Sequence, residues 1–224
     1  MAETRYPGYD VLAKRDTPSW NEKTRAVINQ RLATPRQPRF FDQTEWAMVQ
    51  AVAARIVPQP RRQGGHGEGG NGEEVPVAAL VDTRLHENHQ DGYRNVKLPL
   101  PREAWRRGLR ALDAEARSAY SVPFAMLEGE QQDALLKKME SGDLHGPAWE
   151  GMPSKEFWSH HLLRDVVYAY YSHPTAWSEI GWGGPASPRG YVRLQSDESD
   201  PWDAAEAKPG ESRERVRKEN ERVR

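Results

Sequence analysis

Five of the seven histidines are candidates for a chemical role, because an imidazole can bind a metal ion or move a proton near neutral pH. They are His86, His89, His160, His161 and His173. His86 and His89 are three residues apart and could share a helix face, but they lack the H-E-x-x-H pattern of zinc hydrolases. Neighbouring residues on a helix point about 100° apart, so at most one of His160 and His161 can face a given site. We therefore expect solvated or hydrogen-bonded histidines. The alternative is a metal-assisted enzyme that uses His86, His89, His161 or His173.

Other catalytic patterns give the enzyme interpretation little support. The sequence contains a G-x-G-x-x-G pattern, at Gly65, Gly67 and Gly70. A dinucleotide site needs a strand before this pattern and a helix after it. Here the flanking segments are VPQPRRQ and NGEEVP, which have neither signal. A flexible loop is therefore the better interpretation. The sequence also lacks a G-x-S-x-G elbow and a P-loop. Catalytic residues can be scattered along a chain, so the enzyme interpretation is weakened and not removed.

Composition excludes several further classes of protein. None of the 224 residues is cysteine, so the chain can neither form disulfides nor hold an ordinary iron–sulfur cluster by itself. A net charge of −1 argues against a nucleic-acid binder, which needs clustered Lys and Arg. No apolar run is long enough to cross a membrane, and the start MAETRYPGYDVLAKRD resembles neither a secretory signal nor a twin-arginine signal. We therefore expect a soluble, cytoplasmic chain.

Apolar residues recur every three or four positions along much of the chain, which is the spacing of helices. Asp42 or Thr44 is a suitable N-cap for one of them, and Pro58 ends it. Strand-like alternation of useful length is absent. The sequence thus predicts an all-α bundle of about five or six helices, at about residues 20–31, 41–58, 77–85, 101–120, 135–142 and 154–172.

The sequence predicts that the chain divides into three parts. Residues 1–40 form an arm with one helix, and residues 41–194 form the helical domain, with a flexible Gly-rich loop at 58–74. Residues 195–224 carry mixed charges and almost nothing apolar after Trp202, so we expect a solvated, disordered tail. A structural scaffold that recruits partners through this tail is a further alternative.

An aromatic segment lies between the last predicted helix and the tail. Six of the twenty aromatic residues fall between Tyr168 and Tyr191, interleaved with glycine and proline. Such a backbone cannot continue a helix, yet it carries much apolar surface. Two interpretations stay open: the rings cap the core of the chain's own bundle, or they form an interface with another protein, where Tyr and Trp concentrate.

The same segment resembles a known family, the gluconate 2-dehydrogenase subunit 3 family. The resemblance lies in a helix that ends at Tyr170 and Tyr171, then Pro174 and Trp177, the run Ile180-Gly181-Trp182-Gly183-Gly184-Pro185, and a close from Pro188 to Tyr191. Weaker similarity extends over about residues 41–194.

The resemblance implies a non-catalytic small subunit that supports folding, stability or assembly of a large FAD-binding subunit of the glucose–methanol–choline (GMC) oxidoreductase type. That partner would oxidise a sugar or polyol, as in gluconate 2-dehydrogenase or a glucoside 3-dehydrogenase, and a cytochrome c subunit or another acceptor would take the electrons. No catalytic residue, cofactor or metal is expected on this chain. Many members carry an export signal, so export to the periplasm with a signal-bearing partner is the alternative to the cytoplasm. The expected partner interface comprises Tyr170, Tyr171, Pro174, Trp177, Ile180, Trp182, Pro185 and Tyr191.

Overall fold

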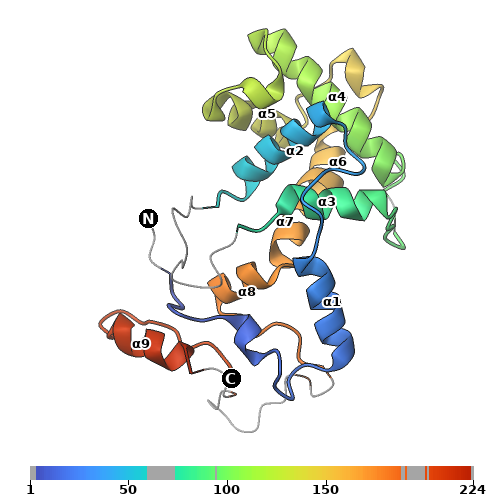
Figure 1. Ribbon diagram of the computed structural model, residues 1–224. Helices are drawn as coiled ribbons and strands as arrows, with labels where there is room; N and C mark the ends of the chain where they lie inside the picture. The colour runs from blue at the N-terminus through green and yellow to red at the C-terminus, as the bar shows by residue number, and fades with distance from the viewer. Residues whose placement is uncertain are drawn as a thin grey trace. The chain divides into compact units, whose positions relative to one another are not determined.

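The computed structural model describes residues 4–59, 74–93, 95–187, 190, 200 and 202–222. Over these residues the regular structure is helical, and the β-contact is an isolated parallel bridge between Trp20 and Ser187 (Figure 1). The predicted all-α fold is confirmed. Within the same residues no helix is both long and apolar enough to cross a membrane. The chain divides into two units. The described residues of the central unit are 34–59, 76–93 and 95–170, and those of the terminal unit are 4–33, 74–75, 171–187, 190, 200 and 202–222.

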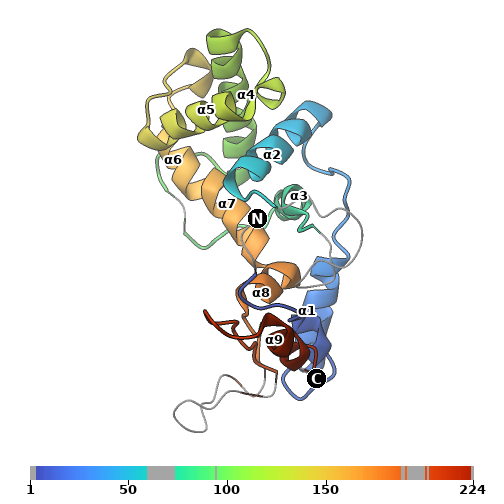
Figure 2. The ribbon, with the colours of Figure 1, turned by 90° about the vertical axis from the view of Figure 1, so that its left-hand side faces the viewer.

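The central unit contains most of the predicted helices. Its helices are α2 (Gln43–Ile56), α3 (Val77–His86), α4 (Pro101–Tyr120), α5 (Gly129–Ser141), α6 (Ser154–Phe157) and α7 (Leu163–Tyr171), the last ending one residue into the terminal unit. A π-helix, η4 (Trp158–Leu162), joins α6 to α7, so that residues 154–171 form one continuous rod (Figure 2). Two short 3-10 helices, η2 (Phe124–Met126) and η3 (Pro147–Trp149), lie on either side of α5 along the chain. Each helix predicted between residues 41 and 172 is present.

Local signals in the sequence explain where these helices begin and end. The Asp42 side chain accepts a hydrogen bond from the Glu45 amide at 2.8 Å, and the Glu45 carboxylate accepts one from the Asp42 amide at 3.1 Å. This capping box confirms Asp42 as the predicted N-cap of α2. Helix α4 begins at Pro101, where the missing amide hydrogen costs nothing, and ends before Ser121, whose φ is +64°.

The core of the central unit is built around the indole of Trp105 on α4, which is fully buried. The rings of Phe41 and Phe157 meet it edge-on, with centroids 5.7 and 5.8 Å away. Gly108 lets the chain approach Phe157, because a Cβ atom there would lie 2.3 Å from the Phe157 ring. The aromatic core thereby packs α4 closely against the rod of residues 154–171.

The terminal unit joins the two ends of the chain. Its helices are η1 (Val11–Lys14), α1 (Glu22–Leu32), α8 (Pro174–Ile180) and α9 (Arg213–Asn220). They enclose a cluster of buried side chains: Tyr9, Val11, Trp20, Ile28 and Trp177. Backbone hydrogen bonds reinforce it, from the Asn21 amide to the Ser187 carbonyl at 2.8 Å and from the Ser187 amide to the Ser19 carbonyl at 3.0 Å.

Lys14 lies fully buried within this unit. Its ammonium group donates to the Ser19 hydroxyl at 3.1 Å and lies 5.6 Å from the centroid of the Trp20 ring. Burial lowers the pKa of Lys14 from 10.5 to about 8, and the charges of Asp203 and Asp200 partly oppose this shift.

The division into units differs from the boundaries that the sequence predicted at residues 40 and 194. The reason is that α8 and the residues after it share a core with the N-terminal arm, since Trp177 packs with Tyr9 and Trp20. Residues 4–33 of the predicted arm are therefore part of the terminal unit, and residues 34–40 are part of the central unit. The Gly-rich loop predicted at 58–74 lies mostly outside the described residues.

The C-terminal tail also differs from its prediction as a solvated segment. Residues 213–220 form α9, whose Val216 is buried against the unit (red in Figure 1). The buried amide of Asn220 donates to the Pro7 carbonyl at 2.9 Å and the Ala205 carbonyl at 3.0 Å, and its oxygen accepts from the Ala205 amide at 2.7 Å. One apolar side chain and one fully satisfied amide thus anchor a helix that is otherwise charged.

Candidate functional site

The aromatic segment contains a regular helix within residues 168–187, despite its glycine and proline content. Pro174 occupies the first turn of α8, and His173 caps it, with its ring nitrogen Nδ1 accepting a hydrogen bond from the Thr175 amide at 3.3 Å. Gly181 ends the helix in the left-handed conformation, with φ at +69°. The segment therefore contributes a short capped helix, where the sequence predicted an irregular backbone.

Trp177 belongs to the core of the terminal unit. Its side chain is 2% exposed, and its indole nitrogen donates to the Tyr171 carbonyl at 2.6 Å. Gly184, with φ at +67°, passes close to the ring, since a Cβ atom there would lie 3.0 Å from it. Pro174 is buried too. Burial therefore removes Trp177 and Pro174 from the predicted contact surface, and the core-capping interpretation holds for these two residues.

Three residues of the predicted interface remain exposed on the same unit. They are Tyr171 and Ile180, each 46% exposed, and Trp182, which is 41% exposed. Trp182 packs edge-on against Trp177, with ring centroids 5.0 Å apart and planes at 82°. We call Tyr171, Ile180 and Trp182 the aromatic edge. Trp177 holds this edge from within, through contacts to both Tyr171 and Trp182.

The remaining residues of the predicted interface are Tyr170, Pro185 and Tyr191. Tyr170 is buried at the end of the central unit, and Pro185 is half-buried in the terminal unit. Tyr191 lies outside the described residues. Of the predicted interface residues that the structure describes, the three of the aromatic edge are therefore the exposed ones, and the prediction of a partner interface rests on them.

An ionic cluster around the buried Asp165 in the central unit escaped the sequence prediction. Asp165 is 4% exposed, and it accepts hydrogen bonds from the Trp105 indole at 2.9 Å and from the Arg84 guanidinium at 2.9 Å. Arg164 pairs with the same carboxylate at 3.2 Å. Both arginines also reach Asp91, at 2.7 Å from Arg84 and 2.8 Å from Arg164. Two acids therefore balance two arginines, and the loop after α3 is fastened to α7.

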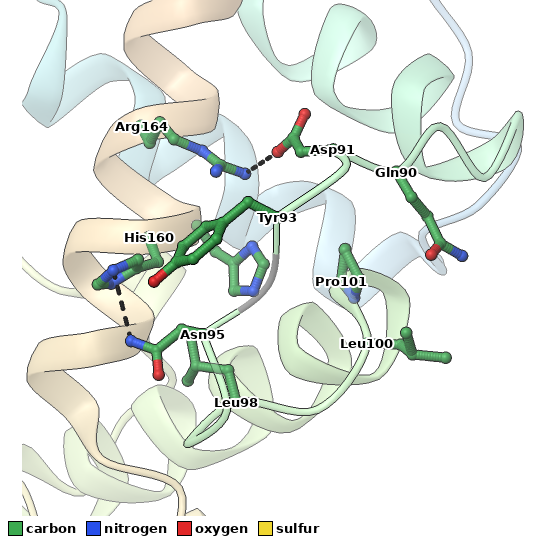
Figure 3. A pocket seen from close by; sticks show the side chains of 10 residues that line it. Gln90, Asp91, Tyr93, Asn95, Leu98, Leu100, Pro101, His160 and Arg164 are labelled. Carbon is green, nitrogen blue, oxygen red and sulfur yellow. Dashed lines mark hydrogen bonds and ion pairs between the residues drawn. The ribbon is translucent and has the colours of Figure 1, made fainter.

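Beside this cluster lies a hollow of about 40 Å³, which we call the polar hollow (Figure 3). Asp91, Asn95, His160, His161 and Arg164 line its polar side. Tyr93, Leu98, Leu100 and Pro101 contribute apolar surface to it. The hollow is large enough for a few water molecules or for the end of one side chain.

His161 is the histidine with the most unusual surroundings. It is 6% exposed, and its Nδ1 atom has no hydrogen-bond partner among the described residues, the Asp165 carboxylate being 3.9 Å away. Burial lowers the pKa of His161 from 6.5 to about 4, with Asp165 partly opposing the shift. The imidazole is therefore neutral at pH 7. The π-helix η4, a feature common at functional sites, carries it.

His160 lines the same hollow as His161. His86 and His89 are exposed on the same unit, His89 lying 3.4 Å from the Glu87 carboxylate. In the terminal unit, His173 caps α8. Among the residues that the structure describes, no three side chains of the metal-binding types are placed to hold a metal ion.

Comparison of the sequence with family models places the chain in a class of subunits from dehydrogenase complexes. The family model for gluconate 2-dehydrogenase subunit 3 matches residues 43–184, from the start of α2 to Gly184. This match covers more than half of the chain, and the chain belongs to the gluconate 2-dehydrogenase subunit 3 family. Searches of curated proteins and of solved structures gave no match.

One sequence signal could have revealed that Asp165 is buried. Asp165 follows His161 by four residues, on the stripe that also carries Phe157. A carboxylate on an apolar stripe predicts a buried charge with a partner, because an unpaired one is too costly to bury. The partners Arg84 and Trp105 come from other helices and could not be assigned from spacing alone.

Proposed function

We propose that this chain is the non-catalytic accessory subunit of an FAD-dependent sugar or polyol dehydrogenase. It binds the large GMC-type subunit and supports its folding, stability or assembly. The family match over residues 43–184 is the main support for this proposal, because the family is named for a subunit of a dehydrogenase complex.

The aromatic edge supports a role in protein binding. Large rings at an interface give much contact area for little loss of conformational entropy. Trp182 is held against the buried Trp177, and Tyr171 is held through its backbone carbonyl. Because these contacts are made before a partner arrives, little further ordering would be needed on docking.

In this proposal the redox chemistry takes place on other subunits. FAD is bound by the large subunit, and a cytochrome c subunit or another acceptor receives the electrons. The chain itself lacks cysteine, so it offers no thiolate for an iron–sulfur cluster or for the thioether links of a c-type haem.

Affinity purification from the native host tests the proposal. We expect the tagged chain to bring down a large yellow protein that releases FAD on denaturation and oxidises a sugar or polyol. A chain purified under the same mild conditions with no flavoprotein, and able to turn over a substrate unaided, would contradict it. Metal analysis of the same sample tests the alternative of a metal-assisted enzyme, which requires a stoichiometric metal ion.

A further inference from the structure

The N-terminal arm contacts the aromatic edge at Gly181, the residue between Ile180 and Trp182. The Tyr6 ring lies against Gly181 so closely that a Cβ atom on this glycine would overlap the ring. Tyr6 is half-buried, and it also packs against the core cluster of the terminal unit. The arm therefore supports the edge directly between two of its three residues.

The position of Tyr6 depends in turn on the C-terminal end of the chain. The Ala207 amide donates a hydrogen bond to the Arg5 carbonyl at 2.8 Å, and the Asn220 side-chain amide donates to the Pro7 carbonyl at 2.9 Å. Both sequence neighbours of Tyr6 are therefore hydrogen-bonded to the C-terminal segment. We call these two pairings, of Arg5 with Ala207 and of Pro7 with Asn220, the terminal clasp.

Gly181 needs such support, because glycine has more backbone freedom than any other residue. Its φ is +69°, and the turn that it forms at the end of α8 determines where Trp182 lies. The Trp182 amide donates to the Trp177 carbonyl at 2.9 Å, which closes this turn. The Tyr6 ring fills the space beside Gly181, so that the turn has less room to move.

We propose that Tyr6 is a positioning residue for docking of the large dehydrogenase subunit, an inference that rests on the proposed function. The terminal clasp holds the Tyr6 ring against Gly181, and the ring keeps Trp182 in the orientation that the large subunit binds. Binding at the aromatic edge and closure of the clasp stabilise each other, because the coupling between two sites is reciprocal. The C-terminal helix α9 thus contributes to affinity through Tyr6.

Titration calorimetry of the purified chain with the purified large subunit tests the role of Tyr6. Tyr6→Ala removes the ring from Gly181 and is expected to weaken binding at least about tenfold. Tyr6→Phe keeps the ring, and the atoms nearest to Gly181 are ring carbons. Its affinity should therefore stay within about threefold of the unaltered chain.

Asn220→Ala tests whether the effect is transmitted from the C-terminal helix. Asn220 is 1% exposed and cannot contact a partner, so any loss of affinity must pass through the clasp. We expect binding to weaken at least about threefold. Glu219→Ala, at the exposed neighbouring position, is the matched control and should bind within about twofold of the unaltered chain.

Amide hydrogen exchange gives a second readout, and its first part needs no partner. In the free chain, Tyr6→Ala should quicken exchange at Gly181 and Trp182, whose amides donate to carbonyls of α8. In the complex of the unaltered chain, exchange at Ala205 and Val216 should slow, because docking stabilises the clasp.

The outcomes separate this inference from the proposed function. If the unaltered chain binds the large subunit and Tyr6→Ala binds equally well, Tyr6 has no positioning role while the accessory role stands. If only Tyr6→Ala binds weakly and Asn220→Ala binds normally, the coupling through the clasp is wrong. If the unaltered chain fails to bind, the proposed function falls and this inference falls with it. Should Tyr6→Ala not fold, the affinity of Asn220→Ala decides.

Discussion

The indole of Trp182 packs edge-on against the indole of Trp177, with 5.0 Å between the ring centroids. Trp177 is 2% exposed and Trp182 is 41% exposed. The two tryptophans, which are five residues apart, therefore have different structural roles. One completes the core of the terminal unit, and the other is held at its surface.

We expect Trp177→Ala to act on stability. The substitution leaves a cavity among Tyr9, Val11 and Trp20 and removes the hydrogen bond to the Tyr171 carbonyl, so the free energy of unfolding should fall by about 3–5 kcal/mol. Urea denaturation of the isolated chain measures this loss. A change below about 1 kcal/mol would mean that the terminal unit does not depend on this ring.

Asn220→Ala tests whether the C-terminal helix is fastened to the N-terminal arm. Loss of the amide leaves the Pro7 carbonyl and both backbone groups of Ala205 without their partner, which should cost roughly 1–3 kcal/mol. Amide hydrogen exchange should quicken at residues 205 and 216. Glu219→Ala, at the exposed neighbouring position on α9, serves as the control and should change stability by less than about 0.5 kcal/mol. Unchanged exchange in the Asn220 variant would show that the contact does not hold the helix.

Helical periodicity predicted most of the fold. The helical spacing of Trp105, Leu109 and Leu112 predicted α4, and Pro101 indicated where the helix begins. Short helices were harder to find, because α8 and α9 have too few residues to show a period. Their positions depend on caps and on single buried side chains, which spacing does not reveal.

The candidate site was predicted only in part. The composition of the aromatic segment showed that it is unusual, but burial distinguishes Trp177 from Trp182, and burial depends on the distant residues Tyr9 and Val11. The same holds for Asp165, which is neutralised by Arg84, 81 positions earlier in the chain. Local spacing can indicate that a residue is buried, but it does not identify the distant residues that pack against it or pair with it.

His161 gives the stability of the central unit a dependence on pH. Its pKa is lowered from 6.5 to about 4 by burial, with Asp165 opposing the shift and Arg164, His160 and Arg84 adding to it. Between pH 6.5 and 4 the unfolded chain binds a proton that the folded chain does not, so stability falls as the pH decreases, by up to about 1.4 kcal/mol per pH unit.

Urea denaturation at several pH values between 7 and 4 measures this dependence. The slope should be smaller in His161→Phe than in the unaltered chain. His86→Phe, which makes the same replacement at an exposed position, is the matched control. Parallel stability curves for His161→Phe and the unaltered chain would show that His161 is not held neutral.

Lys14→Met is expected to stabilise the terminal unit at pH 7. The pKa of Lys14 is lowered to about 8, so at pH 7 the folded chain buries an ammonium group that water would solvate better. Between pH 8 and 10.5 the folded chain loses this proton while the unfolded chain keeps it, and stability rises with pH. Removal of the charge should raise the free energy of unfolding at pH 7 by about 1–4 kcal/mol. A less stable variant at pH 7 would show that the buried charge is compensated.

The central claim is that the aromatic edge binds the large flavoprotein subunit, and the affinity of Trp182→Ala for that subunit tests it most directly. Because Trp182 lies at the surface, the free variant should retain its fold and most of its stability. We predict that its dissociation constant for the large subunit, measured by titration calorimetry, rises at least about thirtyfold, which corresponds to about 2 kcal/mol. A folded variant that binds the large subunit as tightly as the unaltered chain would contradict the claim.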